Sequence, residues 1–269
     1  MTSTFAHATA VRRVDGHDGS DARFDAEVMP GWDIGGNANG GYLLAIAGRA
    51  MREAIGRPPL SLTAHYLRPA PAGACEIVVS TVRSGRRLAT ATAQLVMDDA
   101  VVLQLVGTFG EQQPGGLRWH REPPTDLPDY DDCVRRDVSP DGVAAAFHSR
   151  LATRVRPGDD GYNRGEPTGD PEVRGWFALA AEEPIDAIGL LLAADAFPPP
   201  IFNLGPPPGW VPTIELTVHV RGVPAPGPLR CVFRSRFVDD GLVDEEGEIW
   251  DGSGALVAQT RQLSLIPRS

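Results

Sequence analysis

In the stretch from Trp210 to Arg221, polar and apolar residues alternate from Thr213 onward. A period of two predicts a β-strand with one apolar and one polar face. The Leu-Thr-x-His sequence of this strand, at 216–219, occurs once before, at 62–65. Each copy is followed by a turn rich in Pro, Ala and Gly, and then by three more strand-like runs. The pattern therefore predicts two similar halves.

In the first half the pattern changes to a helical period over about 40–55. Asn39 is a good N-cap residue, apolar and small residues fall on one face, and Gly56 and Pro58 end the helix. Short strands are predicted before the helix, at about 9–14 and 24–29. Four strands are predicted after it, with hairpin turns at 84–85 and 98–99, over about 60–68, 74–83, 86–97 and 100–109. A helix followed by an antiparallel meander is an α+β plan.

Periodicity is lost between Glu111 and Pro140, where prolines and acidic residues accumulate. We therefore predict an N-terminal domain at 1–112, a surface linker at 113–140 and a C-terminal domain at 141–269. The second half is expected to hold a helix at 184–196, with Pro184 in its first turn. Its other strands are expected at about 144–154, 173–180, 229–238, 242–250 and 255–266. We expect the two Leu-Thr-x-His strands to pair and merge the sheets, because bare strand edges invite aggregation.

The composition is that of a globular protein, with a chain of 269 residues and a net charge of −10. The negative charge argues against nucleic acid as a partner, although a few local arginines could still hold a small phosphate-bearing ligand. The three cysteines are widely spaced and form no C-x-x-C pair, which argues against a disulfide framework or a zinc site. The longest charge-free apolar stretch, 187–194, is too short to span a membrane, and the start has no apolar run of signal-peptide length. We expect a cytoplasmic protein with no membrane partner.

Several motifs along the chain resemble those of the double hot-dog acyl-CoA thioesterases, the acyl-CoA thioesterase II family. In the first half these are Asn39-Gly40-Gly41-Tyr42, His65-Tyr66-Leu67-Arg68-Pro69 and Gly85-Arg86. In the second half they are Ala194-Asp195, Thr213-Ile214 and Val257-Ala258 with Thr260 and Gln262. The resemblance covers nearly the whole chain except the linker and the loop at 157–171. It departs after Thr213, where Glu-Leu-Thr stands in place of the family's more usual Asp-His-Ser.

The resemblance implies a double hot-dog fold, in which each of two helices is wrapped by an antiparallel sheet. It further implies that Asp195, Thr213 and Gln262 form the catalytic constellation of an acyl-CoA thioester hydrolase that needs no cofactor or metal. The substrate partner would be acyl-CoA. A homodimer or a larger homo-oligomer is compatible with this expectation.

The candidate residues also have plain structural readings. Asp195 could be a helix-end carboxylate in water, although the helix dipole disfavours an acid near a C-terminus. Thr213 is a β-branched residue in a strand, which is commonplace. Gln262 shares a strand face with apolar residues, so we expect its amide to be buried and to need hydrogen-bond partners.

The proposed substrate contacts have similar alternatives. Asn39, Gly40 and Gly41 could simply cap a closely packed helix, or they could present free N–H groups to the thioester oxygen. Arg86 belongs to the densest basic group of the chain, and it could contact a CoA phosphate or be a solvated hairpin charge.

Signatures of other enzymes are missing from the sequence. It contains no G-x-S-x-G nucleophile elbow, no H-E-x-x-H motif, no P-loop and no Rossmann glycine pattern. Two alternatives stay open beside the thioesterase. One is a non-catalytic acyl-CoA or fatty-acyl binding protein on the same fold, and the other is a hot-dog hydratase.

Overall fold

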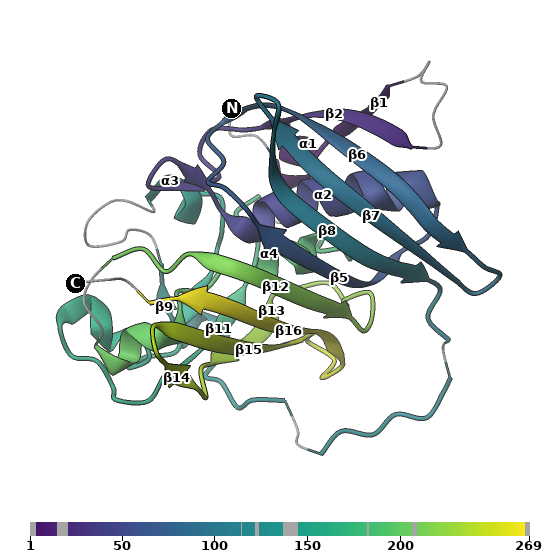
Figure 1. Cartoon of the computed structure of the whole chain (residues 1–269). Coiled ribbons are helices and arrows are strands. Elements are labelled where there is room, and N and C mark those ends of the chain that lie inside the picture. Colours follow the sequence, from purple (N-terminus) through teal and green to yellow (C-terminus); the bar gives the residue numbers. More distant parts are fainter. Residues whose placement is uncertain are drawn as a thin grey trace.

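The computed structural model describes residues 4–14, 21–113, 115–121, 124–136, 145–181, 183–205 and 209–266. Within them, one antiparallel sheet of 14 strands runs through both halves of the chain (Figure 1). The strand order is β1-β2-β6-β7-β8-β5-β12-β16-β15-β13-β11-β10-β9, and β14 pairs with β15 beside this path. A large antiparallel sheet with few helices agrees with the predicted α+β class.

The first half holds most of the long elements. Its helices and strands are α1 (Phe5–Ala8), β1 (Val11–Val14), β2 (Ala22–Val28), β3 (Asp33–Ile34), β4 (Asn37–Ala38), α2 (Gly40–Ile55), β5 (Pro59–Tyr66), β6 (Gly73–Ser84), β7 (Leu88–Met97) and β8 (Ala100–Gly110). The predicted helix and all six predicted strands of this half are confirmed within a few residues. The hairpin predicted at 98–99 is also confirmed, with Asp98 and Asp99 both at positive φ, a conformation that Asp tolerates better than most residues.

The second half holds shorter elements, joined by more irregular chain. They are η1 (Tyr130–Asp132), β9 (Val134–Arg135), α3 (Ala145–His148), β10 (Arg154–Val155), η2 (Gly161–Arg164), β11 (Glu172–Phe177), α4 (Gly189–Ala193), η3 (Pro200–Leu204), β12 (Thr213–Val220), β13 (Leu229–Arg234), β14 (Val238–Asp239), β15 (Leu242–Trp250) and β16 (Leu256–Leu265).

Two predictions for the second half are wrong. The helix predicted at 184–196 is reduced to α4, because the Asp186 side chain accepts hydrogen bonds from the N–H groups of Ile188 and Gly189 and starts the helix only there. The strand predicted at 144–154 is wrong as well. Residue 144 lies outside the described residues, and the rest of that range contains α3 and only the start of β10.

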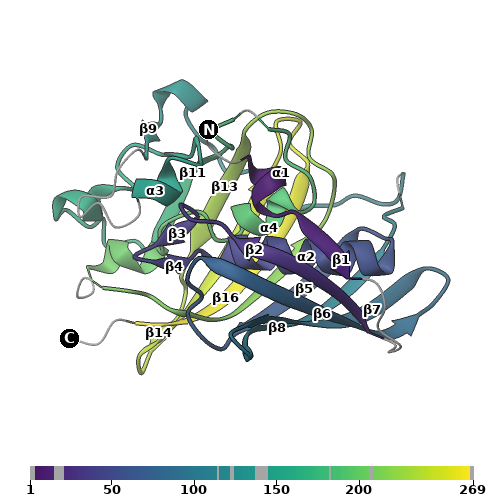
Figure 2. The ribbon, with the colours of Figure 1, turned by 90° about the horizontal axis from the view of Figure 1, so that it is seen from above.

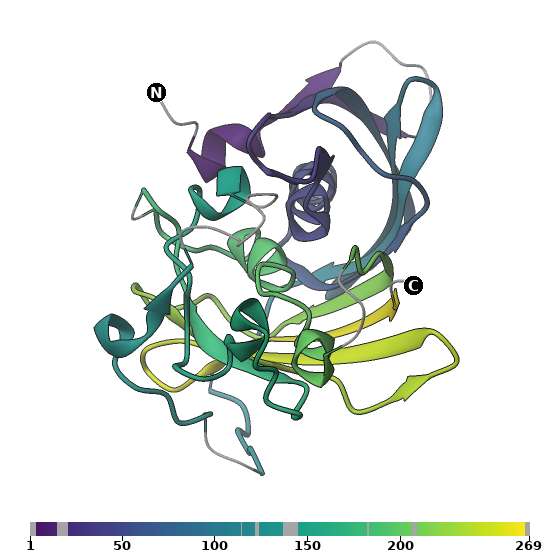
Figure 3. The same cartoon turned by 90° about the vertical axis from the view of Figure 1, so that its left-hand side faces the viewer.

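The curled sheet of the first half wraps around α2, which is seen end-on in Figure 3. Ten of the residues of α2 are buried, and Ala45, Ala47 and Gly48 keep its surface small. The helix begins where Asn39 accepts a hydrogen bond from Tyr42 N, and it ends at Gly56 in the left-handed conformation. Viewed from above, α4 lies beside α2 (Figure 2).

The two Leu-Thr-x-His strands pair with each other, as predicted. Strands β5 and β12 are antiparallel neighbours, and Thr63 lies directly opposite Thr217. The two hydroxyl groups form a hydrogen bond of 2.9 Å. This junction makes the sheet continuous between the halves.

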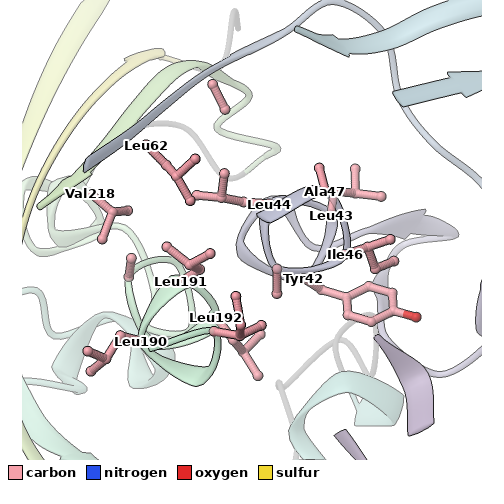
Figure 4. Packing of buried hydrophobic residues seen from close by; sticks show 14 of the residues in the cluster. Tyr42, Leu43, Leu44, Ile46, Ala47, Leu62, Leu190, Leu191, Leu192 and Val218 are labelled. Atoms are coloured by element: carbon pink, nitrogen blue, oxygen red, sulfur yellow. The ribbon is translucent and has the colours of Figure 1, made fainter. Parts of the chain in front are cut away.

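A single hydrophobic core extends across both halves. Figure 4 shows α2 and α4 in contact through buried side chains, with Leu62 of β5 and Val218 of β12 closing the space above them. All of the labelled residues are nearly inaccessible to solvent. The start of α2 and the end of α4 are therefore held together by packing, and the candidate site is located at that point.

Candidate functional site

The site begins with Asn39, which caps α2 and links it to the other half of the chain. Its backbone N–H donates to Trp32 O, and its Oδ1 accepts a hydrogen bond of 3.0 Å from Tyr42 N. Its Nδ2 donates both to the backbone oxygen of Asp195, at 2.7 Å, and to Asp195 Oδ2, at 2.9 Å. One side chain therefore fixes both the start of α2 and the chain that follows α4.

The carboxylate of Asp195 lies at the N-terminus of α2. Besides the Asn39 amide, its Oδ2 accepts a hydrogen bond of 2.9 Å from the backbone N–H of Gly41. A helix start presents N–H groups without partners inside the helix and favours negative charge there. The sequence places Asp195 just past a helix C-terminus, but the fold turns its side chain to the favourable end of the neighbouring helix.

Burial and hydrogen bonding act in opposite directions on this carboxyl group. Desolvation raises the pKa of Asp195, and the N–H groups of Gly41 and Gly40 together with the Asn39 amide lower it. Burial prevails, and the pKa rises to about 6. A carboxylate with such a pKa is ionised at neutral pH and is a better proton acceptor than an ordinary aspartate.

The close contact around Asp195 requires glycine at two positions. A Cβ added to Gly41 would lie 2.8 Å from Leu191 O and 2.9 Å from Leu192 O, both rigid backbone atoms. A Cβ added to Gly40 would lie 2.9 Å from Asp195 Oδ2 and 3.0 Å from the Tyr66 ring. The predicted residues Asn39, Gly40, Gly41 and Asp195 are thus brought together.

Thr213 and Gln262 lie on neighbouring strands, β12 and β16. Thr213 is the Cα partner of Ser264, and Gln262 Nε2 donates to Ser264 Oγ at 3.0 Å. Ser264 and Gln262 are buried. Within the described part of the chain, no hydrogen bond joins either Thr213 or Gln262 directly to Asp195.

Two further residues of this region were not predicted from the sequence. Tyr66 Oη donates to the carbonyl of Gly40 at 2.9 Å, and burial followed by the Asp195 charge raises the pKa of Tyr66 well above its usual range. Glu245 lies directly across β15–β16 from Gln262. Burial, then the charge of Asp195, raises the pKa of Glu245 well above its usual range.

A sequence signal for both residues existed. Glu245 is two residues from Val243 and from Gly247 along the strand, so it shares their face, which the apolar Val243 and Ile249 assign to the interior. Tyr66 belongs to the His-Tyr-Leu-Arg-Pro motif at the end of its strand.

Arg86 is located away from the other predicted residues. It lies exposed in the hairpin between β6 and β7, and Arg57, just past the end of α2, donates to Gly85 O in this hairpin at 2.8 Å. Asp195 lies at the opposite end of α2. This helix has 16 residues, so the two positions are separated by about 24 Å at about 1.5 Å per residue.

The described residues also bear on two other features, a metal site and a membrane-spanning helix. Among them, no group of three or more His, Cys, Asp and Glu side chains is arranged to hold a metal ion. No helix in the same part of the chain combines the length and the apolar character needed to cross a bilayer.

Comparisons with known proteins agree on one family and one fold. Residues 28–110 match the model of the acyl-CoA thioesterase N-terminal domain, and residues 124–266 match that of the C-terminal domain. A solved structure from Thermobifida fusca, described as a candidate thioesterase II, is 31% identical, with 99% of this chain and 98% of that one covered and a TM-score of 0.88. A hot-dog protein of unknown function from Alicyclobacillus acidocaldarius is 23% identical over the full length of both chains, with a TM-score of 0.84. An uncharacterised protein of Mycobacterium tuberculosis is 28% identical over 99% of both chains.

Proposed function

The chain belongs to the acyl-CoA thioesterase family, and from this premise we propose that it hydrolyses acyl-CoA to a free fatty acid and CoA by means of a water molecule held by Asp195, Thr213 and Gln262. The observation that carries the proposal is the position of the Asp195 carboxylate, buried at the start of α2 with a pKa raised to about 6. Such a group can accept a proton from water at neutral pH.

Besides the base, the proposed reaction needs groups that stabilise the oxyanion and groups that orient the water. Water attacks the thioester carbonyl carbon while Asp195 takes its proton, and the carbonyl oxygen becomes negatively charged. The tetrahedral intermediate then collapses, the carbon–sulfur bond breaks, and the proton passes from Asp195 to the leaving CoA thiolate. The backbone N–H of Gly41 is well placed to stabilise the oxyanion, because it already holds a carboxylate oxygen at 2.9 Å.

This assignment couples substrate binding to the strength of the base. In the structure the Gly41 N–H donates to Asp195, and that hydrogen bond is the main influence that lowers the pKa of Asp195. If the thioester oxygen takes over this N–H, the carboxylate loses a donor and its pKa rises further. Asn39 retains its own hydrogen bond to Asp195 and keeps the carboxylate in position.

Thr213 and Gln262 are proposed to orient the water from the sheet side. Thr213 on β12 is paired with Ser264 on β16, two residues after Gln262. The Gln262 amide is buried and therefore needs hydrogen-bond partners. The proposed CoA phosphate contact, Arg86, lies at the far end of α2. It therefore requires the CoA moiety to extend along the helix.

We also propose that the fold is a tandem repeat of two hot-dog domains, at 1–112 and 141–269, joined by the linker 113–140. The antiparallel pairing of β5 with β12 and the side-by-side helices α2 and α4 support this proposal. Strand β9 falls within the linker and pairs with β10, so the end of the linker extends the second sheet.

A thiol-release assay with acyl-CoA substrates of increasing chain length tests the proposed function. We expect release of free CoA at a rate that depends on enzyme concentration and reaches a maximum at one range of chain lengths. Tight acyl-CoA binding without thiol release would instead indicate a binding protein. Hydration of an enoyl-CoA double bond would indicate a hydratase.

A further inference from the structure

Two polar side chains lie opposite each other on the inner face of the sheet beside the proposed site. Glu245 of β15 lies opposite Gln262 of β16, and Arg234 of β13 lies opposite Glu246. We call Glu245 and Gln262 the polar pair. Two such residues opposite each other on the inner face of the sheet require an explanation.

Gln262, one member of the polar pair, has an unpaired buried atom. Among the described residues, Gln262 Oε1 has no hydrogen-bond partner, and it is shielded from solvent. The Gln262 Nε2 group is engaged by Ser264 Oγ. Opposed residues in antiparallel strands have Cβ atoms about 4.5–5.5 Å apart, so the carboxyl group of Glu245 is within reach of the Gln262 amide.

The protonation state of Glu245 determines which hydrogen bonds it can form. An ionised carboxylate only accepts hydrogen bonds and cannot satisfy the carbonyl oxygen of Gln262. A neutral carboxylic acid can donate to Gln262 Oε1. The reverse orientation of the Gln262 amide would suit an ionised Glu245, so the surrounding charges decide between the two states.

The surrounding charges favour the neutral acid. Burial raises the pKa of Glu245 most, and the charges of Asp195, after α4, and of Asp244, the preceding residue on its own strand, raise it further. The nearby cations of β13 and β16 lie on the outer face, where Arg234 pairs with Glu172 and Glu248, and Arg236 and Arg261 pair with Glu246. Asp195 has an amide and a backbone N–H as donors, whereas Glu245 has none of these among the described residues. Of these two carboxyl groups, Asp195 therefore carries the negative charge and Glu245 is neutral.

We propose that Glu245 is a positioning residue of the hydrolytic site, present as a neutral acid that donates to Gln262 Oε1 and so fixes the Gln262 amide toward the reacting water. The proposal rests on the proposed function. It adds a second carboxyl group with a role distinct from that of Asp195. Ionisation of Glu245 would remove its donor and place a second negative charge beside the base.

Kinetic variants provide the first test. Glu245→Gln keeps an N–H donor without a titrating proton, and Glu245→Leu removes the donor. At neutral pH we expect Glu245→Leu to lower kcat about 10–100-fold with little change in KM, and Glu245→Gln to stay within about threefold of the wild type. The wild type should lose activity at alkaline pH, and Glu245→Gln should lack this loss. Glu246→Gln, a neighbouring carboxyl group on the outer face, is the matched control and should keep the wild-type pH profile.

Infrared spectroscopy provides a readout that is independent of turnover. At about pH 8, where Asp195 is ionised, the wild type should show the carbonyl band of a protonated carboxylic acid, and Glu245→Gln should lack it. In Asp195→Asn the band should persist only to a lower pH, because the charge that disfavours ionisation of Glu245 is gone. Absence of the band in the wild type at pH 8 would overturn the proposal, even if Glu245→Leu fails to fold.

The two kinds of failure can be separated. If the wild type releases no thiol from any acyl-CoA, the proposed function fails, and the infrared result still reports the state of Glu245. If the wild type is active and Glu245→Leu matches it in kcat and pH profile, the positioning role is wrong and the proposed function stands.

Discussion

Asp195 is subject to two opposing influences. The N–H groups at the start of α2 and the Asn39 amide stabilise its ionised form, and burial between the two halves destabilises it more strongly. The result is a carboxylate that is mostly ionised at neutral pH yet binds a proton more tightly than an exposed aspartate. These two properties together are what a general base requires.

Replacing Asp195 by Asn preserves the shape of the side chain and removes the base. We expect Asp195→Asn to lower kcat by about 10²–10⁴, the usual span for general acid–base groups. Thr213→Val and Gln262→Leu should each cost less, and combined variants should lose less than the sum of the single effects, because the three side chains are proposed to hold one water. Steady-state thiol release measures all of these variants, with circular dichroism as the check on folding. Wild-type turnover by Asp195→Asn would refute the mechanism.

The same carboxyl group predicts the acid side of the pH profile. Because the pKa of Asp195 is raised to about 6, the protonated, inactive form dominates below that pH. We expect kcat/KM to rise through about pH 6 and to level off around neutral pH, below the alkaline loss expected from Glu245. The residual activity of Asp195→Asn should not follow this titration. A wild-type profile that is flat from about pH 5 to about pH 7 would contradict the assignment.

Substitution of Arg86 tests whether the substrate site extends to the hairpin between β6 and β7. If it contacts a CoA phosphate, Arg86→Ala should raise KM for acyl-CoA by about 10-fold, since a charge-assisted hydrogen bond contributes about 1.5–3 kcal/mol. The kcat should change far less. The exposed Arg83 of the same hairpin region is the control. An unchanged KM would remove Arg86 from the site.

The contact between α2 and α4 depends on glycines that differ in what faces them. A Cβ on Gly41 would meet the backbone oxygens of Leu191 and Leu192, whereas a Cβ on Gly48 would meet the Leu191 Cδ1 methyl group at 2.6 Å. A side chain can rotate away, but the backbone of a packed helix cannot. The tolerance of the two positions should therefore differ.

We expect Gly41→Ala to lower the free energy of unfolding by about 1–3 kcal/mol, because it forces the two helices apart. It should also lower kcat, since the same N–H holds Asp195. Gly48→Ala should change stability by about 1 kcal/mol or less, because an alanine also favours the helix. Urea unfolding measures both variants. Equal effects at the two glycines would contradict the importance of the backbone contact.

Most elements could be predicted from the sequence because their signals are local. The bounds of α2 follow from the Asn39 cap and the Gly56 stop, and the bounds of the long strands follow from alternation and hairpin turns. The length of α4 could not be predicted in this way, because the side chain of Asp186 takes up the N–H groups at its start. The site was less predictable. Alternation gives the face of Glu245 but not the carboxylate of Asp195 that lies near it.

For the whole molecule, the β5–β12 junction and the shared core determine how the halves behave. They are joined by backbone hydrogen bonds, by the Thr63–Thr217 pair and by the contact between α2 and α4. The covalent connection between them, in contrast, runs through irregular chain in which Leu117 is 99% exposed and Trp119 is 73% exposed. The non-covalent contacts should therefore suffice to hold the halves together.

A protease site inserted next to Leu117 tests this expectation. After cleavage we expect the two fragments to elute together in size-exclusion chromatography and to unfold in one thermal transition. Thiol release should persist, because Asn39 and Gly41 come from one fragment and Asp195 from the other. An insertion of equal length that lacks the cleavage sequence is the control. Separation of the fragments would show that the linker itself holds the halves together.

Asn39 both caps α2 and holds Asp195, and this has a consequence for the evolution and the engineering of the protein. Most enzymes offer some residues that adjust stability and others that adjust turnover, so selection can act on one property at a time. Asn39 caps its own helix and holds the carboxylate of Asp195, the proposed base in the other half, with the same amide. Even Asn39→Asp, a conservative exchange at a cap, would set a second carboxylate against Asp195. Laboratory libraries that vary Asn39 and the residues around it should return few improved variants. Variation is better directed to the exposed hairpins.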